Sequence, residues 1–445
     1  MLGLVKNNNY NMNTNNKKLI GEGLTIPFIL ITSLFFLWGL ANNMTDTLLA
    51  AFKKIMSMSD SKTALIQVVC YGAGYGLLAL PAAIFIKKFT YKAGVLLGLG
   101  MYALGAIMFY PAKLTAQYGW FLAAIWVLFA GLSILETAAN PYIITMGPEE
   151  TGTRRLNLAQ SFNPIGSITG VFISQFFILS QLNKAGAKER ALMSHEQLTK
   201  IQEHELNAIT MTYVSVGILL IIIWLLIAFN KKMPIASDTD KNINLLPTFK
   251  RLLKKKHYIW GVIAQFFYVG AQIGVWSFTI RYTMQELKLE QINLPIGTTP
   301  EQIAARYYIA ALVLFTISRF VCTFLMKFIK PSILLSILAF IAIILTSITA
   351  FTGGKLGVYA LVGISATMSL MFPTIFGLAV RGLGEDTKIA GSGLIMAIMG
   401  GAIMTQLQGL VSDLTHSINI SYIIPLFCFV VILLYGYIAT KYEVE

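Results

Sequence analysis

Charged residues are scarce in this chain of 445 residues. Asp, Glu, Lys and Arg make up 12% of it and hydrophobic residues 56%, whereas a soluble globular protein carries about 25% charged residues. The mean hydropathy is +0.69. This composition argues against a soluble domain and predicts a chain that lies mostly inside a lipid bilayer.

Residues that bind metals or form disulfides are also few. The three cysteines, Cys70, Cys322 and Cys428, all fall in apolar segments, and the four histidines lie in or near loops without metal-ligand spacing. A scattered, odd set of cysteines argues against a disulfide framework. A Gly-x-Ser-x-Gly elbow and a phosphate-binding Gly-rich loop are absent as well. We therefore expect no metal, no cofactor and no enzymatic activity.

The N-terminal segment lacks the pattern of a signal peptide. Residues 6–18 are mostly Asn, and the first long apolar run begins only near Ile26. We expect residues 1–25 to be a cytoplasmic tail. The net charge of +14 is better explained by membrane topology than by nucleic acid, because cytoplasmic loops collect Lys and Arg. We expect a lipid bilayer as partner, no nucleic acid, and a monomer.

Twelve apolar segments are long enough to cross a bilayer, which takes about 20 residues each. A basic segment, residues 231–256, separates the sixth from the seventh. The sequence thus predicts an all-α polytopic membrane protein with two six-helix bundles, over residues 26–230 and 257–445. The predicted spans are 26–52, 62–86, 92–111, 118–146, 156–182, 208–230, 257–284, 303–327, 331–351, 356–380, 388–411 and 420–440.

The loops between these spans differ in charge. Placing both termini in the cytoplasm puts the basic central segment and most other loop Lys and Arg residues on the cytoplasmic side, as membrane topology requires. The long loop Asn183–Leu206 falls on the outer side. Ser194 and Gln197, three residues apart, fit a capping box and predict a short surface helix in this loop.

Two carboxylates stand inside apolar spans. Asp46 lies in the first and Glu136 in the fourth, and an ionisable group at that depth costs roughly 2.5–3.5 kcal/mol on insertion scales and usually marks a substrate or proton pathway. Asn43 precedes Asp46 by three residues and Asn140 follows Glu136 by four, so each acid shares a helical face with an amide. The spacing predicts a polar site within the membrane.

Further amides recur at helical spacing. Gln160 and Asn163 continue a polar stripe in the fifth span, and Gln265 and Gln272 lie seven residues apart in the seventh, near Trp276. Amides that bond hydroxyls and aromatic planes that stack on sugar rings are what a sugar site needs. The alternative for the amides is an interhelical hydrogen bond, and for the aromatics it is packing between helices.

Several interpretations remain open at this point. Arg319, a cation within the eighth span, either serves the polar site or pairs with polar groups at the end of its helix. A polytopic enzyme acting on a lipid-linked sugar would place an acid/base pair near the membrane surface and a metal site in a loop. A sugar sensor would need a soluble output domain.

Several motifs together resemble the fucose/galactose/glucose:proton symporter family of the major facilitator superfamily. The similarity runs from about residue 26 to 440. The motifs are Asn42-Asn-Met-Thr-Asp46, Pro81-Ala-Ala-Ile-Phe-Ile-Lys-Lys-Phe-Thr-Tyr-Lys-Ala-Gly94, Leu135-Glu-Thr-Ala-Ala-Asn-Pro141, Arg155-Leu-Asn-Leu-Ala-Gln-Ser-Phe-Asn163, Gln265-Phe-Phe-Tyr-Val-Gly-Ala-Gln272 and Pro373-Thr-Ile-Phe376.

The resemblance implies alternating access, a sugar site at the bilayer midplane, and coupling of proton and sugar movement by Asp46 and Glu136. It implies that Asn43, Asn140, Gln160 and Asn163 line the same cavity as the acids. Phe372 stands where a fucose carrier of the family has a tyrosine, so one sugar-binding hydroxyl is missing. The expected activity is proton-coupled import of L-fucose or a related hexose across a bacterial inner membrane, with a sodium-coupled or uncoupled hexose carrier as the alternative.

Overall fold

The computed structural model describes residues 18–56, 74–115, 117–183, 185, 189–190, 192–234, 245–289, 291 and 300–443. In the first helix it does not describe the side chains of residues 42, 45–47 and 49–54, nor that of residue 301. The secondary structure of the described residues is helical throughout, without a strand.

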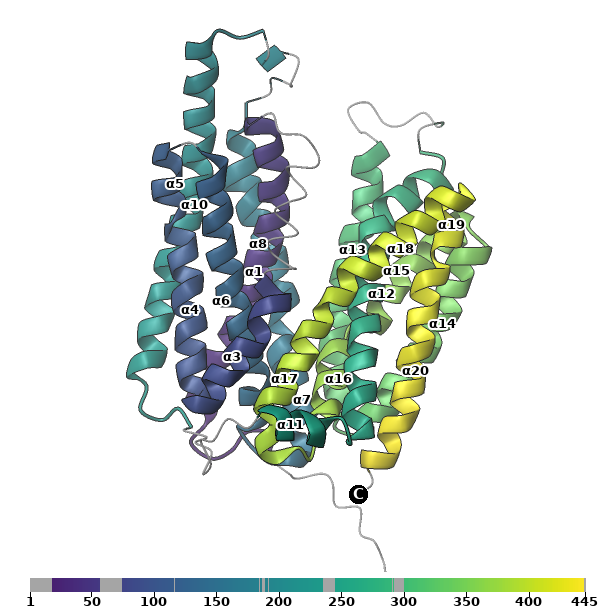
Figure 1. Ribbon diagram of the computed structural model, residues 1–445. Coiled ribbons are helices and arrows are strands. Elements are labelled where there is room, and N and C mark those ends of the chain that lie inside the picture. Colours follow the sequence, from purple (N-terminus) through teal and green to yellow (C-terminus); the bar gives the residue numbers. More distant parts are fainter. Residues whose placement is uncertain are drawn as a thin grey trace, which may run out of the picture.

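Figure 1 shows two bundles of helices that meet at the end carrying the C-terminus and diverge toward the opposite end. We call the end where they meet the closed end. The N-terminal bundle contains α1 (Thr25–Ile55), α3 (Leu77–Lys88), α4 (Tyr91–Ile107), α5 (Phe109–Thr115), α6 (Tyr118–Ile144), α7 (Gly152–Gln160), α8 (Phe162–Ile173) and α10 (His195–Phe229). The C-terminal bundle contains α12 (Lys256–Glu286), α13 (Pro300–Leu325), α14 (Pro331–Phe351), α15 (Gly354–Met368), α16 (Met371–Ala379), α17 (Thr387–Met396), α18 (Gly400–Thr415), α19 (Ile418–Ser421) and α20 (Ile423–Glu443).

The described residues include ten helical segments that are long and apolar enough to cross a membrane. The other two predicted spans are only partly described: α1 is apolar over Thr25–Ala41, and α3 forms the end of the second span. Apolar side chains such as Ile218, Leu226 and Phe340 point outward and are more than half exposed. Polar side chains are buried inside the bundles instead, as expected for a protein whose solvent is lipid. The predicted all-α polytopic fold is confirmed.

Some helix boundaries differ from the prediction. The surface helix and the sixth span are one continuous helix, α10, because no Pro or Gly interrupts the chain between Ser194 and Val216. The capping box of Ser194 and Gln197 is confirmed at its start. The central basic segment, predicted to separate the two bundles, contains a short amphipathic helix, α11 (Leu245–Leu252), at the closed end.

Glycines let α1 and α8 approach at backbone distance. A Cβ atom on Gly166 would lie 1.8 Å from the carbonyl oxygen of Phe36, and one on Gly39 would lie 2.1 Å from that of Asn163. Only glycine fits at such contacts. The close approach brings the amides of both helices, Asn43 and Asn163, to the same seam.

Candidate functional site

Glu136 lies in the buried middle of α6, where 3% of its surface is exposed. Neither carboxylate oxygen forms a hydrogen bond of ordinary geometry with the described residues. The hydroxyl of Tyr75 faces the carboxyl and accepts a hydrogen bond from Trp38 Nε1 at 2.8 Å. Burying a carboxylate without hydrogen bonds is costly. This position therefore calls for a proton or a polar ligand.

Two predicted amides form a chain that leads to Glu136. Gln160 Nε2, at the end of α7, donates to Asn140 Oδ1 at 2.7 Å. Asn140 Nδ2 in turn donates to the backbone carbonyl of Glu136, one turn earlier in α6, at 2.9 Å. All three side chains are buried. The structure thus joins three residues that the sequence proposed separately.

The remaining amides of the N-terminal bundle bond the backbone of α1. Asn43 Nδ2 donates to the carbonyl of Gly39 at 3.4 Å, and Asn163 Nδ2 donates to that of Phe35 at 3.3 Å. Both side chains are half-buried. Asp46 belongs to the same helix as Asn43, three residues on, but its side chain lies outside the described part of the chain. Its predicted role stays a prediction.

In the C-terminal bundle, α12 carries both predicted amides. Gln265 is fully buried, and neither atom of its amide is hydrogen-bonded among the described residues. Gln272 is half-buried. An unpaired buried amide is costly, which suits a polar position that a ligand completes.

The aromatic residues of this bundle make contacts of their own. Trp276 is half-buried; its Nε1 donates to Ser365 Oγ at 3.1 Å and its ring meets Phe315 edge-on at 5.1 Å. Phe372 is buried and lies edge-on to Tyr268 at 6.2 Å. One edge of Trp276 therefore packs within its own bundle, as the packing alternative proposed.

Arg319 lies in α13 and is 3% exposed. Its Nη1 donates to the backbone carbonyl of Gln160 in the other bundle at 2.9 Å, and its Nε donates to the carbonyl of Ser369 in its own. The guanidinium lies 4.6 Å over the ring of Phe315. Arg319 therefore bonds the backbone of Gln160, a predicted site residue, across the boundary between the bundles.

Tyr75 and Trp38 beside Glu136 were not among the predicted site residues. The sequence contains a signal for Trp38, which precedes Asn42 by four residues and Asp46 by eight and so shares their helical face. No comparable spacing points to Tyr75, because it lies in a different helix from every predicted site residue. Tyr75 lies two residues before the start of α3, and α3 packs against α6, the helix of Glu136.

The bundles are joined at the closed end by α16 and α17 packing against α3, α6 and α7. Asn157 Nδ2 donates to Thr374 Oγ1 at 3.1 Å, and the ammonium of the buried Lys388 lies 5.0 Å from the ring centre of Tyr91. Asp386 binds the exposed Arg251 of α11 and raises the pKa of its guanidinium. These contacts shut this end of the molecule.

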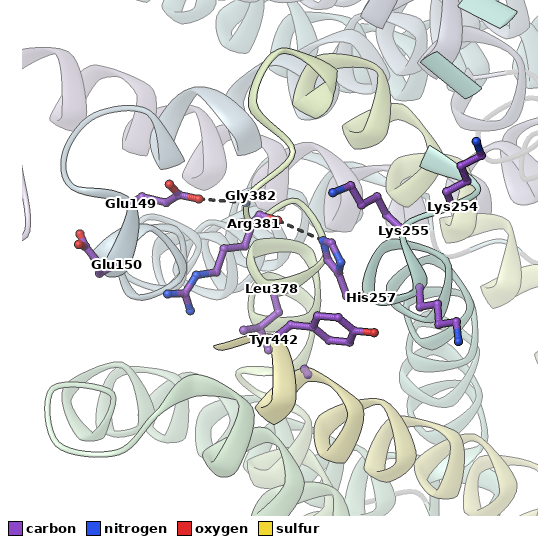
Figure 2. A pocket seen from close by; sticks show the side chains of 11 residues that line it. Glu149, Glu150, Lys254, Lys255, His257, Leu378, Arg381, Gly382 and Tyr442 are labelled. Carbon is purple, nitrogen blue, oxygen red and sulfur yellow. Dashed lines mark hydrogen bonds between the residues drawn. The ribbon is translucent and has the colours of Figure 1, made fainter. Parts of the chain in front are cut away.

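A cavity of about 790 Å³ lies at the same end, between the loops of both bundles and the start of α12. Figure 2 shows Glu149, whose Oε1 accepts from the backbone N–H of Gly382 at 2.9 Å, and His257, whose Nε2 lies 3.1 Å from the carbonyl oxygen of Arg381. None of the predicted sugar-site residues lines this cavity. It is a feature of the closed end and is separate from the buried acid and amides.

Two helical bundles in a membrane, joined at one end, with a buried acid and amides between helices, define a multi-pass membrane transporter. The chain belongs to the Major Facilitator Superfamily, whose family model matches residues 28–406. It is 40% identical over 436 residues to the L-fucose-proton symporter of Haemophilus influenzae, covering 96% of this chain and 99% of that protein.

It is 30% identical over 439 residues to the glucose/galactose transporter of Brucella abortus, with 98% of both chains covered. A solved structure of a superfamily transporter, FucP, in the outward conformation is similar at a TM-score of 0.86 and 39% identity, covering 93% of this chain and 99% of that one. The relatives are named as transporters, not as enzymes. The resemblance seen in the sequence is confirmed.

Proposed function

We propose that this protein imports L-fucose or a closely related hexose together with protons across the inner membrane of a bacterium. The observation that carries the proposal is the buried cluster of Glu136, Asn140 and Gln160, in which neither carboxylate oxygen forms a hydrogen bond of ordinary geometry with the described residues and the hydroxyl of Tyr75 faces the carboxyl. A proton and a sugar hydroxyl are both suited to that position. Near-full-length similarity to an L-fucose-proton symporter supports the choice of cargo.

The proposed roles rest on the family resemblance and, for Glu136, on its burial. Asp46 and Glu136 carry the coupling between proton and sugar, and Glu136 also binds the sugar. The two bundles together supply the sugar contacts, as transporters built from repeats place substrate at the interface between the repeats. The proposed contacts are Asn43, Glu136, Asn140, Gln160 and Asn163 in the first bundle, and Gln265, Gln272, Trp276 and Phe372 in the second.

A second sugar class has specific support. Phe372 is buried against Tyr268 and offers no hydroxyl, and the Brucella abortus relative is named for glucose and galactose. A site built to bond a hydroxyl discriminates strongly against a sugar that lacks it. Sequence identity favours fucose, because it is 40% to the L-fucose-proton symporter and 30% to the glucose/galactose transporter. The missing hydroxyl at Phe372 instead favours a sugar with a different pattern of hydroxyl groups.

The proposed orientation places the closed end in the cytoplasm, with both termini, because the basic central segment lies there. The bundles diverge toward the other end, so the site would then receive sugar from outside. Alternating access requires the contacts of α16 and α17 with α3, α6 and α7 to open in the second half of the cycle.

The test is uptake into proteoliposomes of the purified protein. Labelled L-fucose is offered with an inward proton gradient, with a sodium gradient, or with neither, and unlabelled galactose, glucose and fucose compete. Accumulation driven by protons and blocked best by fucose supports the proposal. Accumulation driven by sodium alone, or equilibration without accumulation under either gradient, contradicts proton coupling. If glucose or galactose competes better than fucose, that sugar and not L-fucose is the substrate.

A further inference from the structure

Arg319 is a buried cation that has no carboxylate partner among the described residues. It donates hydrogen bonds to two backbone carbonyls, those of Gln160 and Ser369. Carbonyls inside a helix are normally occupied by the N–H group four residues later. A carbonyl that lacks this N–H partner is therefore a favourable acceptor for a buried guanidinium.

Two prolines free these two carbonyls. Pro164 follows Gln160 by four residues and Pro373 follows Ser369 by four, and proline has no N–H to donate. Gln160 is also the last residue of α7, and Ser369 directly follows α15. The C-terminal ends of both helices thus point partial negative charge at the guanidinium, which stabilises a cation in apolar surroundings.

The two helices belong to different bundles. We propose that Arg319 is a positioning residue whose hydrogen bonds to Gln160 and Ser369 hold the two bundles together while the closed end is shut. We call these bonds the strap, and we propose that the strap is linked to the sugar site. The link continues from the Gln160 backbone through its side chain to Asn140 and the Glu136 backbone. Closure of the inner end and the placement of the sugar-binding amides are therefore parts of one connected arrangement.

The strap favours one state of the transport cycle. When the closed end opens, α7 moves away from α13, and the bond from Arg319 to Gln160 breaks. The guanidinium and a carbonyl without an N–H partner then each lose a hydrogen bond inside the membrane, which is costly. The role of the hydrogen bonds between the bundles rests on alternating access alone, whereas their link to the sugar site rests on the proposed function; neither depends on which sugar or coupling ion is carried.

The experiment measures how often the closed end opens, in the absence of sugar. Thr153 faces Gly377 across the bundle seam, where a Cβ atom on Gly377 would lie 2.7 Å from Thr153 Oγ1. A Thr153→Cys reporter in a background without the three native cysteines is labelled in nanodiscs with a water-soluble maleimide. Arg319→Met should speed labelling about ten- to hundredfold, the size of one hydrogen bond to a charged group.

Arg281→Met is the matched control. Arg281 lies 4.9 Å over the ring of Phe278 in its own bundle, much as Arg319 lies over Phe315, but it is exposed. This variant should label at the parent rate. Equal labelling of Arg319→Met and the parent overturns the strap. Faster labelling of Arg281→Met to the same degree overturns it too, because loss of any stacked arginine would then suffice.

A second variant tests the strap with Arg319 in place. Pro164→Ala gives residue 164 a backbone N–H group. This N–H group competes with the Arg319 guanidinium for the Gln160 carbonyl. Labelling should rise in the Arg319 protein but rise no further in the Arg319→Met protein, since interacting groups are not additive. Arg319→Lys, which keeps the charge but not the fork of donors, should lie between parent and Met. An equal effect of Pro164→Ala in both backgrounds overturns the proposal, as does no effect in either.

Discussion

Gln160 Nε2 donates to Asn140 Oδ1 at 2.7 Å, which joins α7 to α6 inside the N-terminal bundle. The bond fixes the orientation of the Asn140 amide, so that its nitrogen faces the Glu136 carbonyl. Both amides are buried, and a hydrogen bond between them replaces the water that each would otherwise need. The pair is thereby fixed against the backbone of Glu136, whose carboxyl faces the hydroxyl of Tyr75.

Asp46→Asn should abolish proton-driven accumulation of sugar while it leaves exchange of labelled for unlabelled sugar partly intact. The amide imitates the protonated carboxyl, so the carrier can still alternate when loaded but can no longer release a proton. Uptake with a proton gradient and counterflow without one measure the two activities. An Asp46→Asn protein that still concentrates sugar would show that the coupling proton binds elsewhere.

Glu136→Ala should weaken sugar binding roughly tenfold to more than a hundredfold, because a hydrogen bond to a charged group contributes about 1.5–3 kcal/mol. Titration calorimetry with the purified protein measures the affinity. Ser133→Ala is the matched control, one turn away on α6, where the buried hydroxyl has no hydrogen-bond partner among the described residues. Parent-like binding and transport by Glu136→Ala would remove Glu136 from the site.

Gln272→Ala and Trp276→Ala should each reduce sugar affinity but leave residual transport coupled to the proton gradient. Both side chains are half-buried on α12, in the bundle that lacks the two acids. Uptake at several sugar concentrations, with and without the gradient, separates affinity from coupling. Parent-like affinity in both variants would mean that this face of α12 contacts only its own bundle.

Glu205→Gln should destabilise the protein by about 3–5 kcal/mol, the cost of leaving one charge of a buried pair alone. Arg190 Nη1 donates to Glu205 Oε2 at 2.9 Å, and both side chains are at most 1% exposed. Thermal unfolding in detergent should show a lower midpoint. Glu196→Gln, whose pair with Lys200 is 78% and 73% exposed, should unfold like the parent. Equal midpoints for both variants would contradict a structural role for the buried pair.

Much of the architecture could be predicted from the chain itself. The span over residues 331–351 coincides with α14, because a run of about 20 apolar residues is by itself a membrane helix. The spacing of four between Glu136 and Asn140 likewise puts both residues on one face of α6, where the Asn140 amide bonds the Glu136 backbone. These features depend on local composition and on the 3.6-residue helical period alone.

Relations between different helices could not be predicted in this way. Tyr75 faces Glu136, Gln160 bonds Asn140, and Trp276 turns one edge toward Ser365, each because of how separate helices pack. The continuous α10 was missed for a different reason: a change from polar to apolar composition does not interrupt a helix, and no Pro or Gly stands between Ser194 and Val216, where that change occurs.

The sequence by itself determined the membrane spans, the two-bundle fold and the acids and amides that one helix carries, because these follow from hydropathy and helical periodicity. Only the tertiary structure decided where Arg319 points. Pro164 and Pro373 free two carbonyls in any conformation, but they lie more than two hundred residues apart. A guanidinium on a third helix can reach both only when the bundles close against each other, and that geometry is a property of packing between helices, not of any one segment.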